Sequence, residues 1–180
     1  MAHITLHNDV LPGIVGLLDY RRDTAKPLGE LADILLRGES TLTFAEREII
    51  ASSVSYKNDC HFCHTSHGAA AAVHLGKDAR FIDEIKSGFV NTEISDKLKA
   101  LLVIAHKVQQ GGKFVLPEDI KSAHEQGATD REIHDTVLIA AAFCMFNRYV
   151  DGLGTWSLPD NESFIPMGAN MAHHGYRRTE

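Results

Sequence analysis

The chain of 180 residues is poor in the residues that mark specialised protein classes. It contains only three cysteines, five prolines and one tryptophan, and it has no internal repeat or low-complexity block. Hydrophobic residues make up 44% of the chain and charged residues 23%, which are ordinary values for a globular protein. This composition excludes a disulfide framework, a collagen-like chain and a disordered chain. The length predicts a single domain over residues 1–180.

Long apolar runs and an excess of basic charge are also missing. The longest strictly apolar run covers residues 137–146, about half the length that a membrane-spanning helix needs. Eighteen basic residues stand against 24 acidic ones, for a net charge of −6. We therefore expect neither a nucleic acid nor a membrane as a partner. The first nine residues lack a basic start and an apolar stretch, so we expect no export signal and a cytoplasmic location.

Signals for helices occur along most of the chain. Thr43 with Glu46, and Thr129 with Glu132, have the spacing of a capping box at a helix start. No hairpin dipeptide lies between alternating runs, so an all-α fold of about seven or eight helices is expected. The predicted helices cover residues 28–37, 43–57, 59–75, 78–87, 95–110, 117–127 and 133–149, whereas residues 1–11 and 155–180 are expected to form irregular extensions.

Two of the three cysteines lie close together, in the segment Asn58-Asp-Cys60-His-Phe-Cys63-His-Thr-Ser-His67. Asn58 or Asp59 is a good helix N-cap, which would place both cysteines in the first turns of a helix. The helix dipole and the free amide groups there stabilise a thiolate. Residues spaced i, i+3 and i+7 share one helical face, so Cys60, Cys63 and His67 are expected to point the same way.

A length argument adds Glu48 to the same site. Glu48 lies ten residues before Asn58, and His67 lies nine residues after it. If two antiparallel helices meet at this point, both side chains lie roughly 14 Å from the turn and level with each other. A carboxylate beside an imidazole orients its tautomer and raises its basicity. The pattern predicts a relay in which Glu48 holds His67 and His67 takes a proton from Cys63.

Three kinds of chemistry could use these residues. The first is a thiol–disulfide or peroxidase site, favoured by the helix start and the Glu48–His67 pair. The second is covalent haem, because Cys60-His-Phe-Cys63-His64 matches the C-x-x-C-H attachment pattern, although that attachment normally occurs outside the cytosol. The third is zinc, bound by both thiolates and His64 or His67, although no second C-x-x-C pair is present. We expect no cofactor and no metal.

The spacing of Glu48, Cys60, Cys63 and His67 resembles that of the AhpD-like alkylhydroperoxidases in the carboxymuconolactone decarboxylase family. The ends of the matching region are most similar to the subgroup of peroxidase-related enzymes. The resemblance covers nearly all of residues 11–155. Its flanking parts are the segments 11–14, 48–55 and 146–154.

The resemblance implies an all-helical homo-oligomer, a trimer or hexamer, that acts as a peroxidase of the peroxiredoxin type in antioxidant defence. It implies reduction of hydroperoxides through a redox-active pair recycled by a dithiol donor such as a lipoyl protein. Cys63 would form the sulfenic acid, and Cys60 would resolve it and donate a proton. Glu48 and His67 would form the relay. The decarboxylases of the family use no such cysteine pair, which argues against that reaction.

One residue departs from the family pattern, and it keeps other functions open. Some members carry a histidine directly before the second cysteine, where this chain has Phe62. The alternatives are a disulfide reductase of the same fold and a non-catalytic redox-sensing or metal-binding module. We also expect Cys60, nearer the turn, to be the more exposed thiol. Cys144 lies within an apolar run and is expected to be a core residue without a catalytic role.

Overall fold

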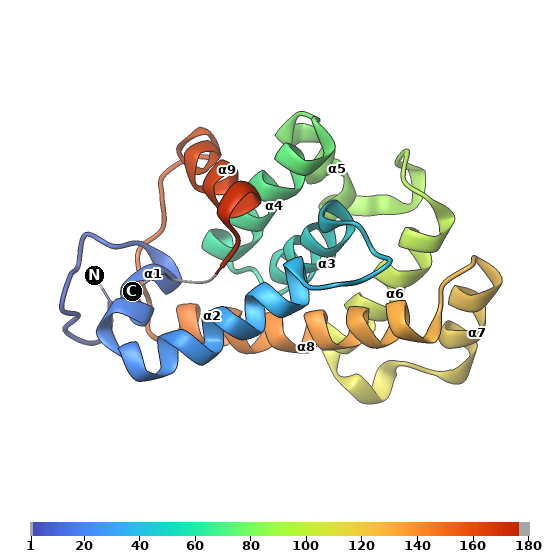
Figure 1. Ribbon diagram of the computed structural model, residues 1–180, viewed down its shortest axis with the longest axis horizontal. Helices are drawn as coiled ribbons and strands as arrows, with labels where there is room; N and C mark the ends of the chain where they lie inside the picture. Colours follow the sequence, from blue (N-terminus) through green and yellow to red (C-terminus); the bar gives the residue numbers. More distant parts are fainter. Residues whose placement is uncertain (1, 177–180) are drawn as a thin grey trace.

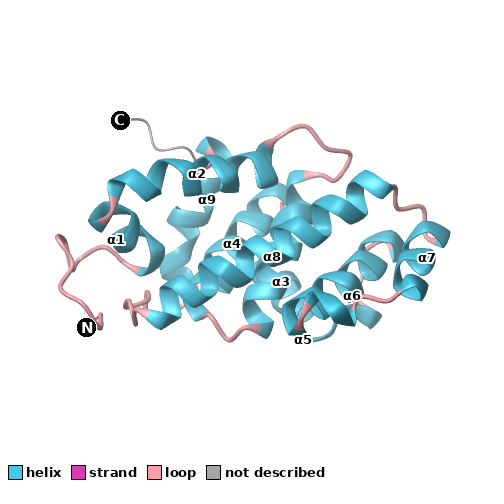
Figure 2. Cartoon of the chain, turned by 90° about the horizontal axis from the view of Figure 1, so that it is seen from below, coloured by secondary structure: helices cyan, strands magenta, loops and turns pink. Residues whose placement is uncertain are grey.

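The computed structural model describes residues 2–176, and within that range the chain is helical, with nine α-helices and no strand (Figures 1 and 2). The all-α prediction is confirmed. The helices outnumber the expected seven or eight because residues 13–37 form two helices and the C-terminal region adds another. Their bounds are α1 Gly13–Tyr20, α2 Arg22–Arg37, α3 Phe44–Lys57, α4 His61–Leu75, α5 Ala79–Gly88, α6 Asp96–Gln110, α7 Pro117–Glu125, α8 Asp130–Gly152 and α9 Ile165–His174, with 3₁₀ turns at Phe89–Asn91, Gly112–Phe114 and Glu162–Phe164.

The C-terminal region differs from the expected irregular extension. Residues 2–11 contain no helix, as expected, but helix α9 lies in the segment 155–180 and packs along α4 (Figure 1). Gly168 makes this close packing possible, because a Cβ at Gly168 would lie 2.5 Å from the Cβ of Ala69. The sequence alone showed no strong periodicity here. The contact with α4 therefore stabilises this short helix.

The core of the fold surrounds α3. This helix contacts α4, α6 and α8, and its residues 45 and 47–55 are all buried. Both predicted capping boxes are present, at Thr43 with Glu46 and at Thr129 with Glu132. They satisfy free amide groups at the starts of α3 and α8. No helix in residues 2–176 is long and apolar enough to cross a membrane.

The turn between α3 and α4 sets the position of the cysteine pair. Asp59 has a φ of +58°, and the amides of Asp59 and Cys60 donate back to the carbonyls of Tyr56 and Ser55, each over 3.0 Å. This is a Schellman motif that ends α3. The expectation that Asn58 or Asp59 caps α4 is wrong, because both residues terminate α3 and Cys60 is the N-cap of α4.

A chain of polar side chains ties this turn to the rest of the fold. Asn147 on α8 donates to Ser55 over 3.0 Å and accepts from Asn58 over 2.8 Å. Gln109 on α6 donates to the Asn58 side chain over 2.9 Å. Asn147 and Ser55 are completely buried, and buried hydrogen bonds of this kind specify a single arrangement. The network holds α6 and α8 against the turn that carries the thiols.

Candidate active site

Cys60 and Cys63 lie together at the start of α4, as predicted. Cys63 is the third residue of the helix, where amide groups without helical partners favour a negative charge. All three cysteines of the chain are free thiols. The expectation that Cys60 is the more exposed thiol is wrong. Its exposed fraction is 0%, against 4% for Cys63, because the apolar side chains of Leu17 and Val150 belong to the same buried cluster.

The Cys60 thiol holds its proton firmly. A hydrogen bond with the Cys63 sulfur raises the pKa of the Cys60 thiol far above its usual range, and burial adds to this rise. Cys60 is therefore protonated at neutral pH and can donate a hydrogen bond to the Cys63 sulfur. A donor of this kind stabilises a thiolate on Cys63.

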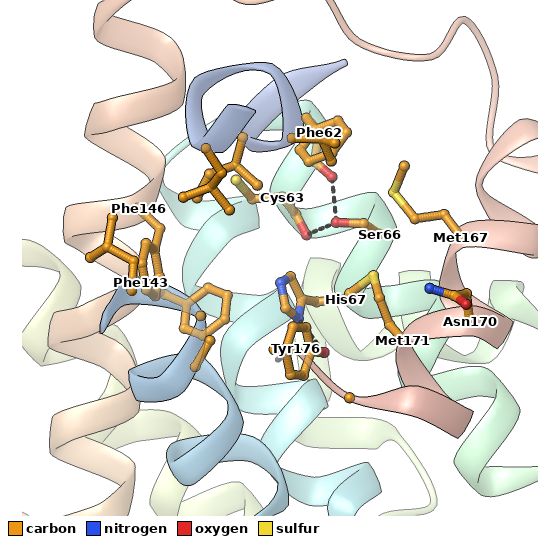
Figure 3. A pocket seen from close by; sticks show the side chains of 17 residues that line it. Phe62, Cys63, Ser66, His67, Phe143, Phe146, Met167, Asn170, Met171 and Tyr176 are labelled. Atoms are coloured by element: carbon orange, nitrogen blue, oxygen red, sulfur yellow. Dashed lines mark hydrogen bonds between the residues drawn. The ribbon is translucent and has the colours of Figure 1, made fainter. Parts of the chain in front are cut away.

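Cys63 opens into a cavity of about 460 Å³ between α1, α2, α4, α8 and the C-terminal segment. Cys60 does not line this cavity, whereas Cys63 and His67 lie on the same wall of it (Figure 3). Cys63 is therefore the thiol that a molecule in the cavity meets. Most of the lining is apolar; it includes Ile14, Leu18, Leu28, Phe62, Phe143, Phe146, Met167 and Met171.

Glu48 and His67 form the contact that the length argument predicted. Nδ1 of His67 donates to Oε2 of Glu48 over 2.7 Å, across the interface between α3 and α4. Glu48 is completely buried, and the side chain of His67 is 12% exposed. In the neutral imidazole, Nδ1–H donates to the Glu48 carboxylate and Nε2 of His67 carries the free lone pair. The imidazole can accept a proton from a group in the cavity, and Cys63 is one turn away.

Two further residues complete the site, and the sequence interpretation missed both. Arg37 at the end of α2 donates from Nη2 to Oε1 of Glu48 over 2.5 Å. The hydroxyl of Tyr176 donates to the same oxygen, and its ring stacks on His67 with 5.6 Å between centroids. Burial alone would raise the pKa of Glu48, but His67, Arg37 and Tyr176 together hold it below its ordinary value. Glu48 is therefore a carboxylate at neutral pH.

The remaining polar candidates lie outside this arrangement. Nζ of Lys86 is 3.2 Å from Nδ1 of His64, and burial together with the Lys86 charge lowers the pKa of His64 to about 4. His64 and His67 thus have partners other than the thiols. Within residues 2–176 no three His, Cys, Asp or Glu side chains are grouped to hold a metal ion. Cys144 packs against the core but is only partly buried, with its sulfur 3.5 Å from Asn58 Nδ2.

Solved structures show which fold the chain resembles. The chain superimposes with a TM-score of 0.77 and 28% identity on an uncharacterised peroxidase-related protein with an alkylhydroperoxidase AhpD core from Ralstonia eutropha, covering 88% of this chain and 81% of that one. The chain has the AhpD-like fold. No protein-family model matches the sequence, and no curated protein is significantly similar to it.

Two more structures share the AhpD-like fold at lower identity. A peroxidase-related protein from Silicibacter gives a TM-score of 0.75 at 24% identity, over 84% of this chain and 78% of that one. The second is a protein of unknown function from Agrobacterium tumefaciens, for which an antioxidant role has been suggested. It gives a TM-score of 0.67 at 17% identity, over 82% of this chain and 99% of that one. The resemblance noted from the sequence is confirmed at the level of the fold.

Proposed function

We propose that this protein is a thiol peroxidase that reduces hydroperoxides through Cys63 and Cys60. One observation carries the proposal: Cys63 and His67 line the same cavity, and the buried carboxylate of Glu48 holds Nδ1 of His67. This supplies a nucleophile, a base and the group that orients the base. The similarity to a peroxidase-related protein at 28% identity supports the same class of reaction.

The chemistry follows in three balanced steps. His67 takes the proton of Cys63, and the Cys63 thiolate attacks the terminal oxygen of the hydroperoxide. The O–O bond breaks, the alkoxide takes the proton from His67 and leaves as the alcohol, and Cys63 becomes a sulfenic acid. The Cys60 thiol then attacks the Cys63 sulfur, which releases water and forms a disulfide. An external dithiol reduces this disulfide in two exchange steps and returns both thiols.

The burial of Cys60 bears on the last step. A reductant that enters the cavity meets the Cys63 sulfur first, so its initial attack would fall on Cys63 and release Cys60 as a protonated thiol. A slender dithiol such as a lipoyl group fits this route better than a folded thioredoxin-like domain. The cytoplasmic location expected from the sequence and the trimeric or hexameric assembly implied by the family resemblance remain predictions.

A disulfide reductase is the second candidate, because Phe62 lines the cavity where some relatives carry a further histidine. Without a second base, reaction with peroxide would be slower while disulfide exchange would be unaffected.

The deciding experiment measures consumption of cumene hydroperoxide and hydrogen peroxide with dithiothreitol or dihydrolipoamide as donor. A peroxidase consumes many equivalents of peroxide per chain, and Cys63→Ser abolishes this. A reductase instead reduces a model disulfide with little peroxide consumption. A redox sensor oxidises once and stops. Metal analysis of the same sample tests the zinc hypothesis, and stoichiometric zinc would contradict the proposal.

A further inference from the structure

The C-terminal segment reaches back to the buried end of the candidate site. Tyr176 lies 128 positions after Glu48 in the chain, yet its hydroxyl donates directly to Glu48 Oε1. We propose that Tyr176 and Arg37 are positioning residues that hold the Glu48 carboxylate against Nδ1 of His67 and so leave Nε2 of His67 free. This inference rests on the proposed function only in that His67 is taken as the base for Cys63.

One face of α2 receives the C-terminal segment. Gly29, Asp33 and Arg37 are spaced four residues apart, so they lie along one side of this helix. A Cβ on Gly29 would lie 3.0 Å from the carbonyl oxygen of Tyr176, and Asp33 Oδ1 accepts the Tyr176 amide over 3.1 Å. Arg37 donates to the carbonyl of Met171 over 3.2 Å. Residues on three successive turns of α2 thus contact the segment that carries Tyr176, and these contacts place its hydroxyl beside Glu48.

The backbone before Tyr176 also suits this path. Gly175 has a φ of +70°, and a Cβ there would lie 2.5 Å from Asp33 Oδ1. Any other residue would be both strained and obstructed at this position. The guanidinium of Arg37 lies 5.1 Å from the centre of the Tyr176 ring, which adds a cation–π contact. The placement of Tyr176 therefore depends on several specific contacts.

The two oxygens of Glu48 have different tasks. Oε2 accepts from His67 Nδ1, whereas Oε1 accepts from both Arg37 and Tyr176. A completely buried carboxylate without a cationic partner would be an uncompensated buried charge, which is costly. Arg37 supplies the compensating charge. Glu48 can therefore stay at this position and orient His67 through Nδ1.

The same contacts act on Cys63. Removing the Arg37 charge leaves the negative charge of Glu48 less compensated, and this disfavours a second negative charge on the Cys63 sulfur. Loss of the Tyr176 hydroxyl should also disfavour the Cys63 thiolate, but by less, because a dipole is removed and not a full charge. Both changes move thiolate formation on Cys63 to higher pH. Arg47 on α3, His74 on α4 and Asp33 on α2 also lie near Glu48, Arg37 or Tyr176, and none of them is altered in these variants.

The test measures alkylation of Cys63 by iodoacetamide as a function of pH, with the site of modification read by peptide mass spectrometry. The variants are Tyr176→Phe, Arg37→Gln and Arg37→Lys. Tyr20→Phe is the matched control, because Tyr20 is 39% exposed and lies outside the cavity. We expect the midpoint of the alkylation curve to lie about 0.5 pH unit higher in Tyr176→Phe and about 1 pH unit higher in Arg37→Gln than in the wild type. The alkylation rate at pH 7 should then fall roughly threefold in Tyr176→Phe and roughly tenfold in Arg37→Gln.

Arg37→Lys keeps the charge and is expected to have a midpoint closer to the wild type than Arg37→Gln. A purely structural role would lower the thermal midpoint without displacing the alkylation curve, and unshifted curves in Tyr176→Phe would overturn the proposal. If Arg37→Gln does not fold, Tyr176→Phe and Arg37→Lys decide. Alkylation needs no peroxide, so a shifted curve in a protein that fails to consume peroxide refutes the proposed function alone.

Discussion

Oε2 of Glu48 on α3 lies 2.7 Å from Nδ1 of His67 on α4, and solvent does not reach the Glu48 carboxylate. The contact spans the interface of two consecutive helices and depends on a turn of three residues between them. It turns the free nitrogen of His67 toward the cavity that Cys63 lines.

Replacing either His67 or Glu48 should slow the reaction of the Cys63 thiol with peroxide, although the thiol itself is still present. His67→Ala should lower the rate of peroxide reduction about 100-fold, because the base that accepts the Cys63 proton is lost. Glu48→Gln keeps a hydrogen-bonding group of the same shape and should lose only about tenfold. Stopped-flow oxidation kinetics across pH 5 to 9 measure both. A His67→Ala enzyme with wild-type kinetics would exclude His67 as the base.

The two thiols should behave differently when each is replaced alone. Cys60→Ser should consume about one equivalent of peroxide and accumulate a sulfenic acid on Cys63, which a dimedone adduct reveals. Cys63→Ser should be nearly inert, because Cys60 is buried and holds its proton. Mass spectrometry after one equivalent of peroxide tests both variants. A sulfenic acid on Cys60 formed at the wild-type rate would mean that the roles are reversed.

Cys144 should have no part in turnover. Cys144→Ser or Cys144→Ala should leave the peroxidase rate within about twofold of the wild type and cost about 1 kcal/mol of stability, the lower end for a partly buried side chain. Urea unfolding measures the loss and the peroxide assay measures the rate. A large loss of activity in a folded variant would identify Cys144 as a resolving thiol.

Helix α9 should fail to dock if Gly168 acquires a side chain. Gly168→Val forces its Cβ against Ala69, so α9 must move away from α4 and carry Tyr176 with it. We expect a lower thermal midpoint and slower alkylation of Cys63 in the same protein. Gly152→Ala is the control, since a Cβ at Gly152 meets no atom within 4 Å. An unchanged alkylation rate in Gly168→Val would show that α9 docking does not support the site.

Glu132 should make the stability of the fold depend on pH in the acidic range. Burial would raise its pKa, but hydrogen bonds from Lys97, the Thr129 amide and Thr41 lower it from 4.5 to about 2. A depressed pKa contributes stability that is complete above the unfolded value and is lost as pH falls from about 4.5 toward 2. Glu132→Gln should cost about 2 kcal/mol at pH 7 and flatten this part of the stability curve. Urea midpoints from pH 2 to 7 check it, with Glu125→Gln, an exposed carboxylate, as control.

Local sequence determined a large part of the fold and of the site. Capping residues mark where α3 and α8 begin, and the helical repeat places Cys63 and His67 on one face, whereas Cys60 is the N-cap of α4 and does not line the cavity. The contact of Glu48 with His67 was also predictable. If two helices joined by a short turn run back along each other, residues equally distant from the turn meet, and α3 and α4 do so at Glu48 and His67.

Other features were decided by the tertiary structure alone. Asn58 and Asp59 are good caps for α4, but the same residues also suit the end of α3, and the packing against Asn147 favours the second use. Cys60 is close to a turn and still buried, because side chains from distant helices cover it. Arg37 and Tyr176 leave no trace in any local pattern. They reach Glu48 from 11 and 128 positions away, and only the packing of α2 and α9 around a buried carboxylate, which must find partners, brings them there.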